Sequence, residues 1–287
     1  MLAACLWGTN GTAQTLAPDG AQPIIIGTLR IALGGLTLLL IAALRGGLRD
    51  LPHKGNRWAA VPTLLAALSM AAYQVFFFAG VARTGVAIGT IVGIGSTPIL
   101  AGPIGFIARG ERPNRRWGIA TALGVIGCGM LIATGETIHI DLLGIFLAIC
   151  AGGSYAVFAT ASKGLIEVHA PEAVMAVTFC LGAVFVSPLL IGADLTWLAQ
   201  PAGALVVLHL SVVTAAIAYT LFAHGLQLVP VATAATLTLG EPLTAGLLGV
   251  FYLREPVTTM AVLGIVMIFT GLVVLATEKL PAKAPAA

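Results

Sequence analysis

Two residues of opposite charge lie inside strongly apolar stretches of this sequence and could bind a charged small molecule. Glu241 falls about ten residues into the stretch 231–253, and Arg30 falls in the stretch 24–44. A carboxylate inside a bilayer costs several kcal/mol unless it is protonated, paired or hydrated. Glu241 could therefore carry a proton or bind a substrate ammonium group, or it could brace a kink at Pro242. Arg30 could face a cavity and meet a carboxylate, or it could extend to the membrane surface.

Two prolines occupy corresponding places in two apolar stretches. Paired interruptions of this kind mark the binding sites of transporters, because the freed backbone carbonyls can coordinate a polar substrate. Glycine and proline also serve close packing and kinks in membrane helices, which is the alternative. The spacing predicts a site formed by Ser96, Thr97 and Pro98 together with Gly240, Glu241 and Pro242.

Further polar and aromatic side chains occur within other apolar stretches. Each of them could line a cavity or could instead serve packing and hydrogen bonding between helices. The substrate-binding residues expected from these stretches are Trp7, Asn10, Arg30, Tyr73, Gln74, Tyr155 and Tyr219.

The elements that position these residues must be membrane helices. The chain is 59% hydrophobic and 9% charged, with a mean hydropathy of +1.03. That leaves too little polar surface for a water-soluble globule, so we expect an all-α membrane protein without a soluble domain. The 14 Lys and Arg form no stripe that could track a phosphate backbone, which excludes nucleic acid as a partner.

The apolar stretches between polar breaks predict ten transmembrane helices around a central cavity. A spanning helix needs about 20 apolar residues, so the first stretch is short. The predicted spans are residues 2–16, 24–44, 58–82, 85–108, 115–134, 142–164, 173–192, 204–227, 231–253 and 257–276.

The distribution of positive charge predicts that both termini are cytoplasmic, because Lys and Arg are retained on that side of the membrane. Only Arg83 and Arg254 then lie in outer loops. Residues 277–287 would form a cytoplasmic tail. The predicted inner loops and tail carry Arg45, Arg49, Lys54, Arg57, Arg109, Arg112, Arg115, Arg116, Lys163, Lys279 and Lys283.

An internal repeat appears when the chain is shifted on itself by 144 residues. It predicts two five-helix units, residues 2–134 and 142–276. Because five is odd, the second unit enters the membrane from the opposite side, so the halves are inverted repeats that could alternate a shared site between the two leaflets. The matched positions include Pro98 and Pro242, Ala101 and Ala245, Gly102 and Gly246, Gly105 and Gly249, Glu111 and Glu255, Gly127 and Gly271, and Leu131 and Leu275.

The stretches 96–111 (STPILAGPIGFIARGE) and 240–255 (GEPLTAGLLGVFYLRE) resemble the signature of EamA-type members of the drug/metabolite transporter superfamily. Leu6-Trp7-Gly8 and Leu29-Arg30 fit the same pattern. The resemblance implies a basket of helices one to four and six to nine around a central cavity, braced by helices five and ten. It also implies export of amino acids, aromatic ones among them, or of related metabolites across a bacterial inner membrane.

Other classes of function find less support in the sequence. Motifs such as HExxH and GxSxG are absent, so we expect neither an enzyme nor a cofactor. Charge pairing with neighbouring arginines and helix capping explain Glu111. A multidrug or nucleotide-type carrier of the same superfamily and a passive channel are the alternatives to an amino-acid exporter. The expected partners are a small-molecule substrate and the lipid bilayer, with a monomer as the working expectation. The four cysteines, Cys5, Cys128, Cys150 and Cys180, lack the spacing of metal ligands.

Overall fold

The computed structural model describes residues 1–50, 58–132, 141–252, 254 and 258–277, and these residues form helices and connecting turns without a strand. Several residues named in the sequence analysis lie outside the described part. They are the predicted tail beyond Thr277, Glu255, which matches Glu111 in the repeat, and the basic residues Lys54, Arg57, Lys279 and Lys283. The α-helices are α1 (Leu2–Trp7), α2 (Thr9–Thr15), α3 (Pro23–Leu44), α4 (Ala60–Arg109), α5 (Arg115–Ile132), α6 (Leu142–Ile166), α7 (Pro171–Val186), α8 (Pro201–His209), α9 (Ala218–Leu228), α10 (Val231–Leu237), α11 (Gly240–Phe251) and α12 (Thr259–Ala276). Short 3₁₀ turns lie at η1 (Gly47–Asp50), η2 (Ser187–Leu190) and η3 (Thr196–Ala199), and a π-helical segment, η4 (Leu210–Ile217), joins α8 to α9.

Eight helical segments of the described chain are long and apolar enough to cross a membrane. They correspond to eight of the ten predicted spans, and their bounds differ from the predicted ones by a few residues. The predicted first span is divided at Gly8 into the short helices α1 and α2, and the predicted fifth span, α5, begins with two arginines. Neither of these two is among the eight, so the predicted count of ten is not confirmed by length and composition.

Helix α4 contains two membrane spans joined at a single glycine. Gly85 has φ 81° and ψ 162°, a backbone conformation open to glycine and unfavourable for other residues, and it separates the spans Ala60–Gly85 and Ile88–Arg109. Pro98 and Pro103 lie in the second of these spans, and the helix continues through both. The prediction that Pro98 interrupts its helix is therefore wrong. The matched interruption near Pro242 exists, since α10 ends at Leu237 and α11 begins at Gly240.

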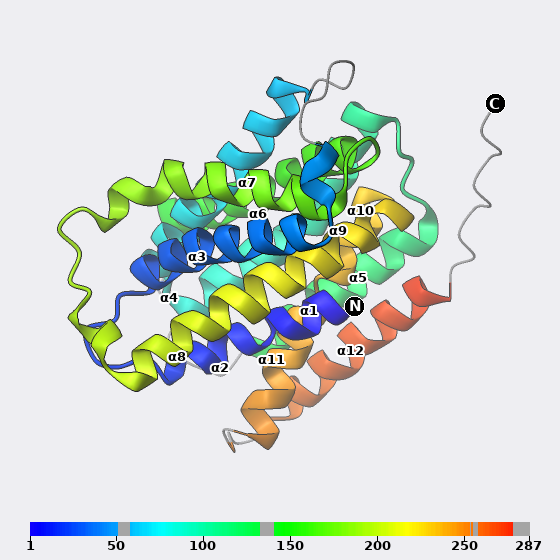
Figure 1. The fold of residues 1–287 in the computed structure, drawn as a ribbon. Helices are drawn as coiled ribbons and strands as arrows, with labels where there is room; N and C mark the ends of the chain where they lie inside the picture. Colours follow the sequence, from blue (N-terminus) through cyan, green and yellow to red (C-terminus); the bar gives the residue numbers. More distant parts are fainter. Residues whose placement is uncertain (51–57, 133–140, 253, 255–257, 278–287) are drawn as a thin grey trace.

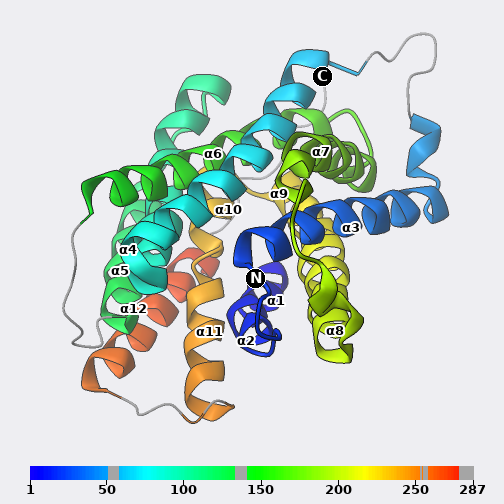
Figure 2. The same cartoon turned by 90° about the vertical axis from the view of Figure 1, so that its left-hand side faces the viewer.

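The helices pack as a bundle in which segments distant in sequence lie side by side. Helix α3 contacts α7 and η4, α4 contacts α6, and α5 lies along α12 at one edge of the molecule (Figures 1 and 2). The contact between α5 and α12 depends on glycine, because a Cβ on Gly127 would lie 2.7 Å from the carbonyl oxygen of Gly264. Close backbone approach of this kind provides van der Waals attraction between membrane helices.

Candidate functional site

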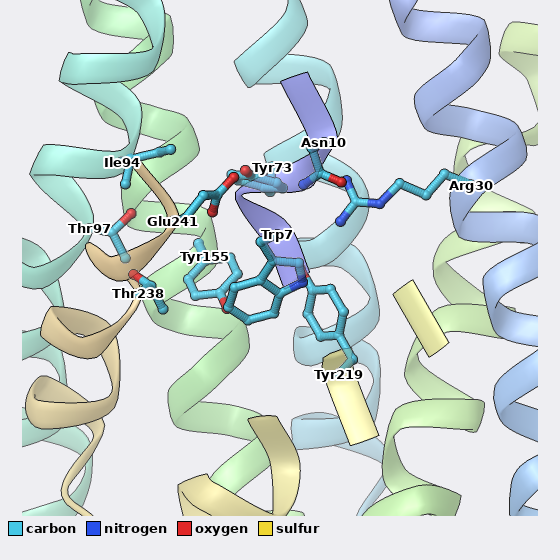
Figure 3. Close-up of a pocket in the computed structure, with 10 residues that line it drawn as sticks. All are labelled: Trp7, Asn10, Arg30, Tyr73, Ile94, Thr97, Tyr155, Tyr219, Thr238 and Glu241. Carbon is cyan, nitrogen blue, oxygen red and sulfur yellow. The ribbon is translucent and has the colours of Figure 1, made fainter. Parts of the chain in front are cut away.

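A narrow pocket with a cavity volume of about 30 Å³ lies in the middle of the bundle, where α1, α2 and α11 meet α3, α4, α6 and α9. The positively charged side chain of Arg30 and the negatively charged side chain of Glu241 point into it, and aromatic rings line it on one side (Figure 3). Its lining residues are Trp7, Asn10, Arg30, Tyr73, Ile94, Thr97, Tyr155, Tyr219, Thr238 and Glu241.

Eight of these residues were expected from the sequence, and the structure gathers them from seven helices. They are Trp7, Asn10, Arg30, Tyr73, Thr97, Tyr155, Tyr219 and Glu241. Their role in binding a substrate stays a prediction, but their convergence on one cavity is the arrangement that such a role requires.

The other expected site residues do not line the pocket. Gln74 is buried between helices, and its amide nitrogen lies so close to Gly27 of α3 that a Cβ there would be 2.5 Å away. The hydroxyl of Ser96 donates to the carbonyl of Gly93 at 3.1 Å. Gly240 lies against Ala4 and Leu272 and so serves helix packing. Pro98 and Pro242 are also not among the lining residues.

The sequence analysis missed Ile94 and Thr238, which lie four residues before Pro98 and Pro242 respectively. A proline in a helix removes the N–H that would bond the carbonyl four residues earlier, so these are the positions whose carbonyls each proline affects. At the second position the N–H of Glu241 donates to the Thr238 carbonyl at 2.8 Å, which closes the turn between α10 and α11. The signal was therefore present in the sequence, four residues before each proline.

Arg30 and Glu241 approach each other across the pocket without forming a direct ion pair. Both side chains are partly buried, and no nitrogen of Arg30 lies within 4.0 Å of a Glu241 oxygen. Asn10 of α2 projects between them, as Figure 3 shows. The Nε of Arg30 and the Oδ1 of Asn10 are buried without a hydrogen-bond partner. The pocket therefore offers separate positive and negative groups with unused hydrogen-bonding capacity.

Aromatic rings form one wall of the pocket around Trp7. The Trp7 indole N–H donates to the carbonyl of Thr214 at 2.9 Å, within the π-helical segment η4. Its ring centroid lies 4.9 Å from that of Tyr219, 5.5 Å from that of Phe222 and 6.3 Å from that of Tyr155. These contacts and the hydrogen bond fix the indole in one orientation.

The division between α1 and α2 lies directly against the start of α11. A Cβ on Gly8 would lie 2.8 Å from the carbonyl oxygen of Glu241 and 2.4 Å from the Cβ of Thr244. Only glycine allows the two backbones to approach this closely. As a result Trp7 and Asn10, on either side of Gly8, enter the pocket next to Glu241.

In the part of the chain that the structure describes, no group of three or more His, Cys, Asp or Glu side chains could hold a metal ion. The pocket is lined by two side chains of opposite charge, hydroxyls, an amide and aromatic rings. This composition suits a small polar molecule that carries charges of both signs.

Comparison with known proteins identifies the family of the chain. Residues 1–133 and, separately, residues 142–277 match the EamA-like transporter family. The chain belongs to this family. It is accordingly a multi-pass membrane transporter, and the resemblance of the two signature stretches is confirmed.

Several relatives of the transporter align over most of its length. An uncharacterized transporter, YwfM, of Bacillus subtilis (strain 168) is 40% identical over 275 residues, which cover 96% of this chain and 91% of the relative. The threonine/homoserine exporter RhtA of Salmonella typhimurium (strain SL1344) is 29% identical over 266 residues, covering 90% and 83%. A solved crystal structure with 20% identity superposes with a TM-score of 0.82 over 96% of this chain and 94% of that one, which shows a shared fold.

Proposed function

We propose that this transporter exports small α-amino acids across a bacterial inner membrane by alternating access, with the central pocket as its substrate site. The main observation in support is that Arg30 and Glu241, which have opposite charges, face one pocket without forming a direct ion pair. The α-ammonium group of the substrate would bind Glu241 and its α-carboxylate would bind Arg30.

A zwitterion suits this pocket because it supplies both missing counter-charges at once. Two separated charges in a partly dry cavity are each costly when unpaired, and direct pairing recovers only part of that cost. A bound amino acid would give the Arg30 guanidinium a bidentate acceptor and the Glu241 carboxylate a donor. Asn10 would then contribute amide hydrogen bonds between the two charged ends of the substrate.

The nature of the relatives supports an amino-acid substrate. RhtA proteins of Salmonella typhimurium and of Escherichia coli (strain K12), 29% and 27% identical to this chain, are threonine/homoserine exporters. The hydroxyls of Thr97 and Thr238 donate to backbone carbonyls and could accept a hydrogen bond from a polar side chain of the substrate. The rings of Trp7 and Tyr155 could contact an apolar or aromatic one.

For the architecture we propose ten helices in two inverted repeats, residues 2–134 and 142–276. In this arrangement the pair α1–α2 and the helix α5 would complete the eight longer spans. The separate family matches over residues 1–133 and 142–277 support this arrangement. The pocket supports it too, since Ile94 and Thr238, and likewise Thr97 and Glu241, are related by the shift of 144 residues.

The proposed orientation places both termini in the cytoplasm. Its support is the charge distribution, because Arg45, Arg109 and Lys163 end α3, α4 and α6 on the predicted inner side. The relatives named as exporters support outward movement of substrate.

Transport in proteoliposomes tests the proposal. Proteoliposomes that contain the purified transporter would be loaded with each of the common amino acids in turn. Exchange would be measured against labelled threonine outside the vesicles. It would also be measured against a toxic amino-acid analogue, chosen because it inhibits the growth of cells that lack the protein. We expect exchange with at least one α-amino acid. We also expect no competition from the amide of that amino acid, which lacks the carboxylate, or from its deaminated acid. Equal competition by either derivative, or exchange with no amino acid, would overturn the assignment.

A further inference from the structure

A largely buried pair of charged groups, Glu111 and Lys163, joins the two halves of the chain at the end of α4, with two further charged residues beside it. Arg109 and Glu111 come from the first half, and Lys163 and Glu167 from the end of α6 in the second. The Nζ of Lys163 lies 3.0 Å from Oε1 of Glu111, and the Nε of Arg109 lies 3.3 Å from the same oxygen. Arg109 also pairs with Glu167. We call these four residues the Glu111 cluster.

The Glu111 cluster also holds the backbone that leads into α10. The N–H of Val231, the first residue of α10, donates to Oε2 of Glu111 at 2.7 Å, and Lys163 donates to the carbonyl of Val229 at 2.6 Å. Glu111 thus caps a helix of the other half of the chain. The sequence analysis expected charge pairing with neighbouring arginines and helix capping for this residue; the pairing with Arg109 is confirmed, and the contacts with Lys163 and Val231 of the other half were not expected.

Burial distinguishes this cluster from the ion pair at the opposite end of the same helix pair. The side chains of Glu111 and Lys163 are 16% and 10% exposed, whereas those of Arg83 and Asp141 are 45% and 35% exposed. Exposed pairs contribute little to stability, whereas separating the partners of a buried pair is costly because it leaves a charge without compensation. The two halves are therefore held more firmly at the Glu111 end.

The cluster lies in line with the pocket. Thr97 and Arg109 belong to the same span of α4 and are twelve positions apart, which corresponds to about 18 Å along the helix. Helix α10, which Glu111 caps, ends next to Thr238 in the pocket wall. Separation of α10 from α4 at Glu111 would therefore open a route from that end of the bundle toward the pocket.

We propose that the Glu111 cluster is the gate that closes the pocket at this end, and that its bonds to Lys163 and Val231 break in each transport cycle. This inference rests on the proposed alternating access but not on the identity of the substrate. The gate can open reversibly because water entering the widened gap solvates the charges that lose their partners. A permanent structural contact would instead remain closed throughout the cycle.

A disulfide across the gate distinguishes a contact that opens from one that does not. A Cβ on Gly105 would lie 3.7 Å from the Cβ of Val231, a separation that a disulfide accommodates without strain. We expect the Gly105→Cys/Val231→Cys transporter to lose transport on oxidation and regain it on reduction. Each single variant, with the native cysteines in place, serves as the control. Unchanged transport by the fully cross-linked protein would overturn the proposal.

A labelling experiment tests the same gate without any substrate. Thr238→Cys would report access to the pocket through its reaction with a membrane-impermeant maleimide, and the side from which Arg112→Cys is labelled would define the Glu111 end. We expect Lys163→Met to raise the labelling rate of Thr238→Cys from that end by about five-fold or more. Arg112→Gln, which removes an exposed charge at the same end, should leave the rate unchanged. An unchanged rate in Lys163→Met would refute the gate, whereas a failure of every amino acid in the exchange assay would refute only the proposed substrate.

Discussion

Replacement of Gly127 by alanine tests the close packing of α5 against α12. The new Cβ would lie 2.7 Å from the carbonyl oxygen of Gly264 and 2.9 Å from the backbone nitrogen of Ile268, whereas ordinary contact begins at 3.4 Å. Because both neighbours are backbone atoms of a helix, α12 must move away by about 0.7 Å. Overpacking of this kind costs about 1–3 kcal/mol.

Gly129 provides a matched control on the same helix. A Cβ on Gly129 meets no atom within 4 Å, so Gly129→Ala should leave stability unchanged or raise it by up to about 1 kcal/mol. Thermal unfolding of the two purified variants, followed by tryptophan fluorescence, measures the difference. At about 2–4 °C per kcal/mol, we expect Gly127→Ala to melt several degrees below the parent protein. Equal melting temperatures for the two variants would show that α5 and α12 do not approach as described.

Two further predictions concern the pocket wall and the topology. Trp7→Phe removes the hydrogen bond to Thr214 and should lower substrate affinity at least about five-fold, whereas Trp197→Phe removes a comparable bond to the Asp194 carbonyl and should lower stability alone. Equal affinities in the two variants would contradict a role for Trp7 in the pocket. A phosphatase that works only in the periplasm should be inactive when fused to the C-terminus, and high activity would reverse the proposed orientation.

Much of the helical layout could be predicted from the sequence, because apolar stretches of about 20 residues with charged ends have few alternatives to spanning a membrane. Eight of the predicted spans are recovered as helices of sufficient length. The division at Gly8 was not predicted, and the structure places this glycine against Glu241 and Thr244, which are far away in the sequence. The helix also continues through Pro98, although proline in a sequence usually predicts a break in a helix.

The pocket was predictable as far as rare residues mark it. Charged and aromatic residues in apolar stretches are conspicuous, and Arg30, Glu241, Trp7 and Tyr219 do line it. Ile94 is aliphatic like most residues of its stretch, so its only mark in the sequence is its place four residues before Pro98.

Contacts between distant segments were beyond the sequence. Lys163 and Val231 follow Glu111 by 52 and 120 residues, and no local pattern joins them. These contacts form because the two halves pack against each other, and that packing cannot be inferred from one sequence without covariation between positions.

The central claim, that Arg30 and Glu241 act together on one substrate, is tested most directly by a double-mutant cycle on transport rate. The two groups lie more than 4.0 Å apart, so their Coulomb energy at an effective dielectric constant of about 20 is below about 4 kcal/mol. Glu241→Gln, Arg30→Ala and the double variant would be compared with the parent protein at equal levels in the membrane. We expect each single variant to lower the transport rate about 10- to 100-fold and the double variant to lose little more, which corresponds to a coupling of about 1–3 kcal/mol. Strictly additive losses, or transport at the parent rate by Glu241→Gln, would show that the two charges act independently and that Glu241 only braces its helix.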